Sequence, residues 1–287
     1  MQSPVAKVLR DAANALSGIS DTPRLDAELL MAHASTMSRS DLLLRQSELH
    51  VPPIFSELLA RRMADEPVAY ITGYRDFWDL RLAVTANVLI PRADSETLIE
   101  AAIEAFSGRD GPARILDLGT GSGALLLAAL SVFEGAHGIA MDASTAALAV
   151  AKRNADSLGF HHRAEFIHLN WRGAEWTTGL GGPFDLILCN PPYVEDHASL
   201  APMVIDHEPH CALFAGPDGL EDYRIVIPAI PMLLAEGAVA VFEIGFTQTQ
   251  AVCDLAADAG LAAEIRRDLA GNPRCLRFSL GIGERDS

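Results

Sequence analysis

The sequence is poor in positive charge. Only two of its 287 residues are lysines, and Lys+Arg number 22 against 38 Asp+Glu, which leaves a formal net charge of −16. A surface with this balance repels phosphate backbones, which argues against a protein that coats DNA or RNA. We expect no direct nucleic-acid binding.

Cysteines and long apolar runs are also scarce. The four cysteines are scattered without a CxxC pair, which fits neither a disulfide framework nor a zinc pattern. The longest apolar run, Ala124–Phe133, is far shorter than the ~20 residues that cross a bilayer. The amino terminus also lacks the pattern of a signal peptide. We expect a cytoplasmic protein without a membrane span.

A metal site is not predicted either. Potential ligands crowd into one proline-containing loop, at His207, Glu208, His210 and Cys211, but no second set of matching spacing accompanies them.

The first quarter of the chain has a helical pattern throughout. Val5, Leu9, Ala12 and Leu16 recur at three-to-four spacing, and strand signals are absent up to about Ile71. Helix-breaking signals divide this region into four or five short helices, at Ser17-Gly18, Asp21-Thr22-Pro23, Ser38 to Ser40 and Val51-Pro52-Pro53. We predict a helical domain over residues 1–75.

The pattern then changes twice. Alternating apolar residues between Phe77 and Ile90 predict a β-hairpin linker over residues 76–91, with its turn at Thr85-Ala86-Asn87. Beyond it, helical and strand patterns alternate, which is typical of a mostly parallel sheet covered on both faces. We therefore predict an α/β domain over residues 92–287. One long helix is expected from about Leu220 to Ala235.

A glycine-rich turn follows the first strand of this α/β region. The apolar run from Ile115 to Leu118 leads into Gly119-Thr120-Gly121-Ser122-Gly123, and a helix follows. Glycines let a ligand approach the backbone, and a helix N-terminus offers free N–H groups. Asp142, nineteen positions after Gly123 at the end of the next strand, can accept both hydrogen bonds of a ribose diol. A tight structural turn is the alternative.

The details of this loop favour one ligand. Its spacing is GxGxG, and the chain has no GxxxxGK[ST] lysine for a triphosphate. The carboxylate of Asp117 would repel a pyrophosphate but suits an ammonium group. S-adenosylmethionine carries both an amine and a ribose diol, so we predict it as the cofactor, with S-adenosylhomocysteine as the product.

A second motif suggests the reaction. The buried-strand run Phe184–Cys189 ends in Asn190-Pro191-Pro192-Tyr193, and ligands of open α/β sheets bind at the carboxyl ends of strands. A planar amine is a poor nucleophile because its lone pair is delocalised. The side-chain oxygen of Asn190 and the carbonyl of Pro191 could accept its N–H bonds and aim the lone pair at a methyl group, while the prolines add no competing N–H.

Tyr193 completes the predicted catalytic set. Its ring offers a π face to the flat amide and to the cationic methyl donor. Asn190, Pro191 and Tyr193 are thus the predicted catalytic residues, and the substrate-binding set adds Pro192. A proline-rich strand exit that merely turns the chain is the alternative.

With these motifs in place, the chain resembles the HemK/PrmC-type glutamine methyltransferases, which methylate the Gly-Gly-Gln motif of peptide chain release factors. The resemblance covers nearly the whole chain. Besides the two motifs, it rests on separate segments, among them Thr72–Trp78, Leu89–Glu96, Glu208-Pro209, Asp218–Leu220, Tyr223-Arg224 and Arg267–Gly271.

The resemblance implies a class I, Rossmann-like methyltransferase with a seven-stranded sheet and a helical domain that helps to grip the release factor. It places Gly119 to Gly123 and Asp142 at the cofactor and Trp171 beside the adenine, and it gives Asn190 a contact with cofactor and glutamine. Two positions depart from the family pattern. Ser95 stands where Thr is frequent, and Asn170 stands where Asp is expected, so the contact with the adenine amine would use the Asn170 side-chain oxygen.

Three other functions stay open at this stage. A sister enzyme methylates a glutamine of a large-subunit ribosomal protein, although the segment Arg92–Glu96 fits the release-factor branch better. A DNA amino-methyltransferase faces the same chemical problem at adenine, but this chain shows no base-reading segment. A non-enzymatic cofactor-binding module would bind without turnover.

Overall fold

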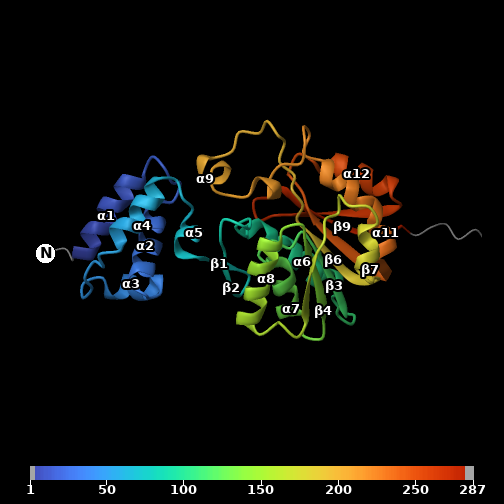
Figure 1. Ribbon diagram of the computed structural model, residues 1–287, viewed down its shortest axis with the longest axis horizontal. Helices are drawn as coiled ribbons and strands as arrows, with labels where there is room; N and C mark the ends of the chain where they lie inside the picture. The colour runs from blue at the N-terminus through green and yellow to red at the C-terminus, as the bar shows by residue number, and fades with distance from the viewer. Residues whose placement is uncertain (1–3, 282–287) are drawn as a thin grey trace, which may run out of the picture. The chain divides into compact units, whose positions relative to one another are not determined.

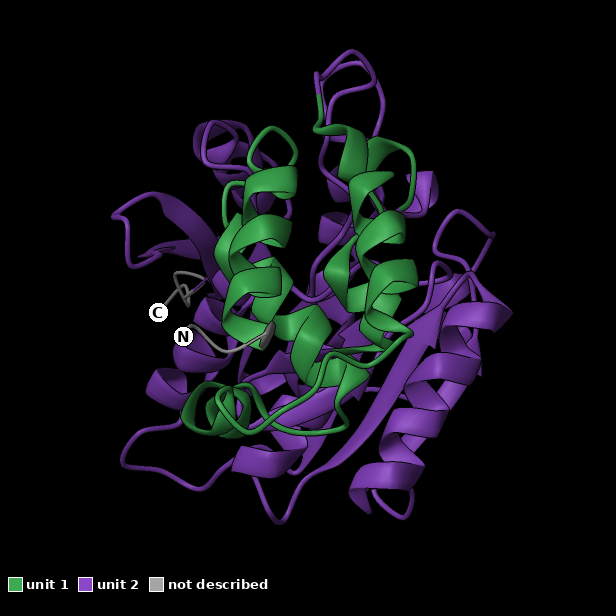
Figure 2. Ribbon diagram, turned by 90° about the vertical axis from the view of Figure 1, so that its left-hand side faces the viewer, with its two compact units in different colours: residues 1–74, 200–207 green, residues 75–199, 208–287 purple. Residues whose placement is uncertain are grey.

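The computed structural model describes residues 4–281, and the chain within them forms two compact units (Figures 1 and 2). The first unit comprises the chain up to Tyr74 together with Leu200–His207. The second comprises Arg75–Ser199 and the chain from Glu208 onward. No helix of residues 4–281 is both long and apolar enough to cross a membrane.

The first unit is helical, as its sequence pattern predicts. Its helices are α1 (Pro4–Leu16), α2 (Pro23–Ala34), α3 (Arg39–Arg45), α4 (Phe55–Met63), α5 (Val68–Thr72) and the short α9 (Pro202–Ile205). The predicted apolar face of α1 is buried in a core with α2, α3 and α4. α1 ends, and α2, α3 and α4 begin, at or beside the predicted breaks, whereas the break between α4 and α5 was not predicted. At Ser38 the hydroxyl accepts a bond from the N–H of Asp41 and caps α3.

A two-stranded hairpin is present, but its turn differs from the prediction. The strands are β1 (Tyr74–Phe77) and β2 (Leu80–Ala83), so the chain reverses at Trp78-Asp79. Trp78 has a φ of 54°, and its N–H donates to the Glu96 carboxylate over 2.9 Å. This bond to a distant side chain satisfies the backbone N–H of Trp78, and no local sequence pattern predicts it. Thr85 to Val88 do form a turn, yet no second strand follows it.

The second unit contains a seven-stranded sheet of order β5-β4-β3-β6-β7-β9-β8. Its strands are β3 (Arg114–Leu118), β4 (His137–Asp142), β5 (Ala164–His168), β6 (Phe184–Cys189), β7 (Leu234–Glu243), β8 (Leu261–Arg267) and β9 (Pro273–Leu280). Every pair from β5 to β7 is parallel, and only β9 runs antiparallel to its neighbours. The predicted mostly parallel sheet is confirmed.

This strand order creates a crevice at a defined place. From β3 the chain adds β4 and β5 on one side, then crosses to place β6 and β7 on the other. The order therefore reverses between β3 and β6, whose carboxyl ends carry the glycine loop and the Asn-Pro-Pro-Tyr tetrad. Open α/β sheets bind ligands at such a switch point.

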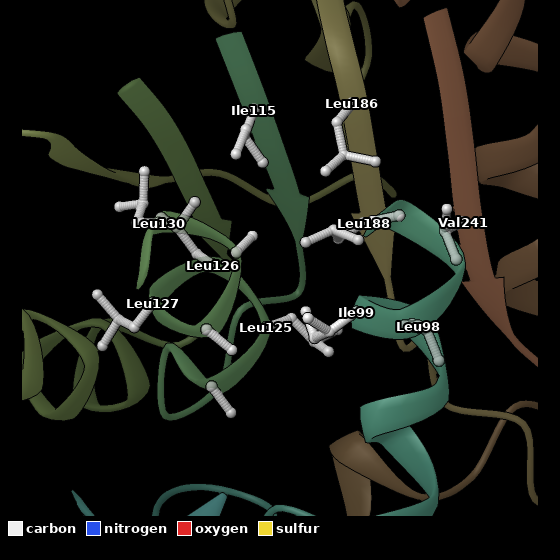
Figure 3. Packing of buried hydrophobic residues seen from close by; sticks show 14 of the residues in the cluster. Leu98, Ile99, Ile115, Leu125, Leu126, Leu127, Leu130, Leu186, Leu188 and Val241 are labelled. Atoms are coloured by element: carbon white, nitrogen blue, oxygen red, sulfur yellow. The ribbon is translucent and has the colours of Figure 1, made fainter. Parts of the chain in front are cut away.

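Both faces of the sheet are covered. The helical elements of this unit are α6 (Glu96–Ala105), α7 (Ala124–Val132), α8 (Thr145–Leu158), α10 (Glu221–Val226), α11 (Ile230–Leu233), α12 (Thr249–Asp258) and the 3₁₀ turns η1 (Ala93–Ser95), η2 (Trp176–Gly179), η3 (His210–Ala212) and η4 (Ile227–Ala229). Side chains of α6 and α7 pack on one face against Ile115, Leu186, Leu188 and Val241 (Figure 3). The alternate strand residues pack with α10 to α12 on the other face.

The expected long helix from Leu220 to Ala235 is wrong. The segment breaks into α10, η4 and α11, and β7 already begins at Leu234. Pro228 and Pro231 explain the breaks, because proline lacks the N–H that an α-helix needs in its interior.

Candidate active site

The glycine loop connects β3 to α7 through three residues of positive φ: Gly119 (72°), Gly121 (55°) and Gly123 (86°). The N–H groups of Gly119 and Thr120 both donate to the carbonyl of Met141, each over 2.9 Å, which ties the loop to the end of β4. A Cβ atom on Gly119 would lie 2.9 Å from the Trp171 ring. Glycine is therefore required there by both backbone conformation and space.

Asp142, at the end of β4, is oriented by two backbone groups. Its carboxylate accepts the N–H of Gly121 over 2.9 Å and that of Ser144 over 2.8 Å. Partial burial raises the pKa of Asp142, while these two bonds oppose the rise. Each oxygen keeps a free lone pair, so the carboxylate can still accept two hydroxyl groups.

Asp117 lies deeper than Asp142. It is only 1% exposed, and one of its oxygens accepts the Thr120 hydroxyl over 2.6 Å. The other oxygen, Oδ1, is buried without any hydrogen-bond partner. Burial raises the pKa of Asp117 to about 7. An unpaired buried carboxylate oxygen is costly, so this position favours a ligand with a positive or N–H-bearing group.

One cavity of about 350 Å³ joins the two motifs, and all the residues that line it belong to the second unit. Eight predicted site residues line it: Gly119, Thr120, Gly121, Asp142, Asn170, Trp171, Asn190 and Pro192. Asp117, Gly123, Pro191 and Tyr193 do not. The wall also contains residues from other segments, among them Val88, Leu89, Arg92, Ser95, Pro209 and Cys211.

Trp171 and Asn170 are held by polar contacts of their own. The Trp171 indole N–H donates to Asp222 over 2.7 Å, which orients the ring beside the glycine loop. The Asn170 side-chain oxygen accepts the N–H of Arg172 over 2.9 Å. Because an amide oxygen has two lone pairs, one is left for the adenine contact expected of it.

The tetrad leaves the end of β6 beside the end of β7. Asn190 is half-buried, and its side-chain N–H₂ contacts the Ser95 hydroxyl over 3.4 Å. The Tyr193 hydroxyl donates to Glu243 over 3.1 Å, and Gln248 donates to the Tyr193 carbonyl over 3.0 Å. The polar end of Tyr193 is thus fixed by the protein, although its ring does not line the cavity.

Two buried carboxylates next to the cavity had no role predicted from the sequence. Glu243 ends β7 and is 1% exposed, and Glu208 is 4% exposed. Glu208 accepts the N–H of Ile90 over 3.1 Å and the Arg92 guanidinium over 2.6 Å, so it holds Arg92 at the cavity wall. For Glu243, the sequence pattern that could have predicted a role was a single acidic residue at the end of an apolar strand. For Glu208, no local pattern predicts its hydrogen-bond partners.

Ser95 directly precedes α6, but its side chain makes no capping bond and donates to Glu243 instead. In the loop that contains Glu208 and Cys211, both Glu208 oxygens already serve protein donors. Residues 4–281 contain no group of three potential ligands that could hold a metal ion.

Comparison with known proteins agrees with this arrangement. Residues 7–73 match the model of the PrmC N-terminal domain, and residues 110–239 match that of a methyltransferase domain. A release factor glutamine methyltransferase of Rhodospirillum rubrum is 42% identical over 262 residues, covering 89% of this chain and 78% of its own length. The enzyme of that name from Cereibacter sphaeroides is 42% identical over 273 residues and covers 93% and 94%.

A solved structure extends the likeness to the fold. A methyltransferase from Pyrococcus furiosus, 17% identical, superposes with a TM-score of 0.53 over 79% of this chain and all of its own. The glycine loop, the cavity and the tetrad thus occur in a chain whose relatives share both its helical and its catalytic segments. The chain belongs to the release factor glutamine methyltransferase family.

Proposed function

We propose that this protein transfers a methyl group from S-adenosylmethionine to the side-chain amide nitrogen of a release-factor glutamine, within the Gly-Gly-Gln motif. The observation that carries the proposal is the single cavity lined by the glycine loop, Asp142 and Asn190. A cofactor site and an amide-binding side chain then open into the same space, as direct transfer between them requires.

The residues present fit the cofactor. Asp142 and the Trp171 ring line the cavity and suit the cofactor's ribose diol and its adenine. Asp117 does not line the cavity, but it is bonded to Thr120, which does, and its unpaired Oδ1 suits the ammonium group. When bound, the cofactor supplies an electrophilic methyl group: an N–C bond forms as the S–C bond breaks, and sulfur keeps the electron pair. The protein's task is to hold and orient the acceptor.

Asn190 and Pro191 do this for the glutamine amide. The side-chain oxygen of Asn190 and the carbonyl of Pro191 accept its two N–H bonds, which directs the nitrogen lone pair and stabilises the positive charge that develops there. The amide nitrogen loses one proton to water after transfer, so no strong base is needed. Pro192, which lines the cavity, borders the acceptor, and the Tyr193 hydroxyl is held by Glu243.

The domain roles belong to the same proposal. Residues 1–75 would dock the release factor, residues 76–91 would link the domains, and residues 92–287 would carry out catalysis. The names of the relatives support release factors as the substrate class. The strongly acidic chain supports a protein substrate over a nucleic acid.

Mass spectrometry of a release factor incubated with the protein and S-adenosylmethionine tests the assignment. We expect one added methyl group on the Gly-Gly-Gln glutamine. A ribosomal protein and duplex DNA are assayed in parallel. A methyl group on either of these, with the release factor unchanged, would contradict the assignment.

The mechanism is tested by Asn190→Ala. We expect a folded protein with somewhat weaker cofactor binding and a rate lowered at least a hundredfold, because one of the two acceptors for the amide is lost. Titration of S-adenosylhomocysteine reports binding separately from rate. Normal turnover in this variant would rule out the mechanism.

A further inference from the structure

Glu243 lies where three parts of the site meet. In the sheet register Phe242 of β7 pairs with Cys189 of β6, so the next residues along, Glu243 and Asn190, are neighbours across the two strand ends. The Glu243 side chain is fully enclosed, at 1% exposure. Burying a carboxylate without hydrogen-bond partners costs free energy. The partners of Glu243 therefore indicate which residues it holds in place.

Both carboxylate oxygens of Glu243 accept a hydroxyl group from a residue at the catalytic edge. Oε2 accepts the Ser95 hydroxyl over 2.5 Å, and Oε1 accepts the Tyr193 hydroxyl over 3.1 Å. The backbone carbonyl of Glu243 accepts the Tyr223 hydroxyl over 2.7 Å. One side chain is therefore bonded directly to the end of the tetrad and, through Ser95, to its beginning.

The bond from Ser95 to Glu243 fixes which group donates and which accepts in the next contact, between Ser95 and Asn190. A serine hydroxyl has one proton, and here that proton is given to a carboxylate, which only accepts. Towards Asn190, 3.4 Å away, the Ser95 oxygen can then act only as an acceptor. The Asn190 group that faces it must be the N–H₂, which leaves the amide oxygen on the other side.

This direction matters because an asparagine side chain is nearly symmetric in shape. Turned by 180°, it would present N–H₂ instead of oxygen to a substrate amide, so that two donors would face each other. The tetrad alone does not decide between the two orientations.

We propose that Ser95 and Glu243 are positioning residues that orient the Asn190 amide so that its oxygen is available to the substrate. Asn190 remains the catalytic residue, and Ser95 and Glu243 act through it. The inference rests on the proposed function, since it concerns the acceptor of the amide N–H bond. It also gives a physical reason why a hydroxyl-bearing residue, Ser or Thr, suits position 95.

The groups around Glu243 are consistent with a carboxylate that accepts. Burial raises its pKa, whereas the bonds from Ser95 and Tyr193 and the nearby Arg274 guanidinium favour the charged form. Arg274 is held in turn by Asp94 over 3.0 Å and by Asp268 over 3.3 Å. The charged neighbours thus come from η1, from β9 and from the loop between β8 and β9.

The test compares Ser95→Ala with Ser95→Thr, which keeps the hydroxyl. We expect Ser95→Ala to lower kcat on the release factor about tenfold to a hundredfold, because Asn190 loses its orienting partner. Ser95→Thr is expected to stay within about threefold of wild type. Affinity for S-adenosylhomocysteine and the melting temperature, measured for each variant, distinguish a positioning role from damage to the fold or to cofactor binding.

Two further measurements test the coupling. In an Asn190→Ala background, Ser95→Ala is expected to cause no additional loss of rate, since the residue it orients is gone. Calorimetric binding of a Gly-Gly-Gln peptide in the presence of S-adenosylhomocysteine should weaken in Ser95→Ala and not in Ser95→Thr. Glu243→Gln, of the same size, should also lower kcat, and no further when added to Ser95→Ala.

The inference is overturned if Ser95→Ala keeps wild-type kcat, if Ser95→Thr loses as much as Ser95→Ala, or if the losses from Ser95→Ala and Asn190→Ala multiply. Wild-type kcat in Glu243→Gln would overturn the role of Glu243. Transfer by the wild-type protein to a ribosomal glutamine instead of the release factor would refute only the substrate assignment. The Ser95 variants would then be compared on that substrate.

Discussion

Asp117 and Asp142 lie at the same edge of the sheet, but their carboxylates differ in burial and in hydrogen-bond partners. Asp142 receives two backbone N–H groups and lines the cavity, so it is prepared to accept hydroxyl groups. Asp117 has one oxygen without a partner, and burial raises its pKa to about 7. The free protein therefore pays a desolvation cost for charging Asp117, and a cationic ligand would relieve it.

Cofactor affinity should consequently depend on pH through Asp117. As pH falls through about 7, Asp117 takes up a proton and loses its attraction for an ammonium group, so affinity should fall by up to about tenfold per pH unit. The stability of the cofactor-free protein depends on pH in the opposite sense. Because the folded-state pKa is raised, the stability contributed by protonated Asp117 is present at low pH and lost as pH rises to 7.

Calorimetric titration of S-adenosylhomocysteine between pH 5.5 and 8.5 measures this effect. Asp117→Asn is the matched control, and we expect it to bind more weakly and with a flatter pH profile. A flat profile in the wild-type protein, or equal slopes in both, would contradict the role assigned to Asp117.

Among the elements, α8 connects the hairpin to the glycine loop through one buried side chain. The Asn154 oxygen accepts the N–H of Ala83 over 2.8 Å, and its N–H₂ donates to the carbonyls of Ala83 over 3.0 Å and Ser122 over 2.8 Å. Asn154 is fully buried. It thereby joins β2 of the hairpin to the turn that begins α7, although these two elements are far apart in the sequence.

Asn154→Ala should destabilise the protein by about 2–3 kcal/mol, because it leaves three backbone groups without their partner. Cofactor affinity should fall as well, since Ser122 belongs to the glycine loop. Chemical denaturation and calorimetry measure the two effects. Asp156→Ala, an exposed change on the same helix, should alter neither. Equal stability of the two variants would show that Asn154 does not connect these elements.

At the scale of the whole molecule, a buried ion pair and the cavity lie in different units. The first unit contains a buried ion pair, in which Arg62, 2% exposed, donates to Asp26 over 2.8 Å. Every residue that lines the cavity belongs to the second unit. Damage to the first unit, which we propose docks the release factor, should therefore impair methylation of a protein substrate before it changes the cavity.

Asp26→Ala should destabilise the helical unit by about 3–5 kcal/mol, because Arg62 is left buried and unpaired. Affinity for S-adenosylhomocysteine should remain within about twofold of wild type, while methylation of an intact release factor falls. Thermal melting by circular dichroism, calorimetry and methylation assays report the three quantities, with the exposed Glu57→Ala as control. A large loss of cofactor affinity in Asp26→Ala would contradict this separation.

The sequence by itself determined the elements and the motifs at their ends. Helical periodicity from Val5 to Ile71, the strand followed by glycines, and the strand followed by Asn190 are local patterns, and the described fold confirms them as structure. Local pattern failed where a distant group or a proline decided the outcome. Trp78 turns the hairpin with its N–H bonded to Glu96, and Pro228 and Pro231 divide a segment whose apolar spacing suggested one helix.

Only the tertiary structure decided which polar side chains meet. Ser95, Asn190 and Glu243 come from η1, from the end of β6 and from the end of β7, and their contacts exist because parallel strands end at one edge of the sheet. Burial likewise is a property of the assembled core, so neither the raised pKa of Asp117 nor the enclosure of Glu243 could be inferred from neighbouring residues. Hydrogen-bond direction follows from such three-dimensional neighbours, whereas periodicity records only which face of an element is apolar.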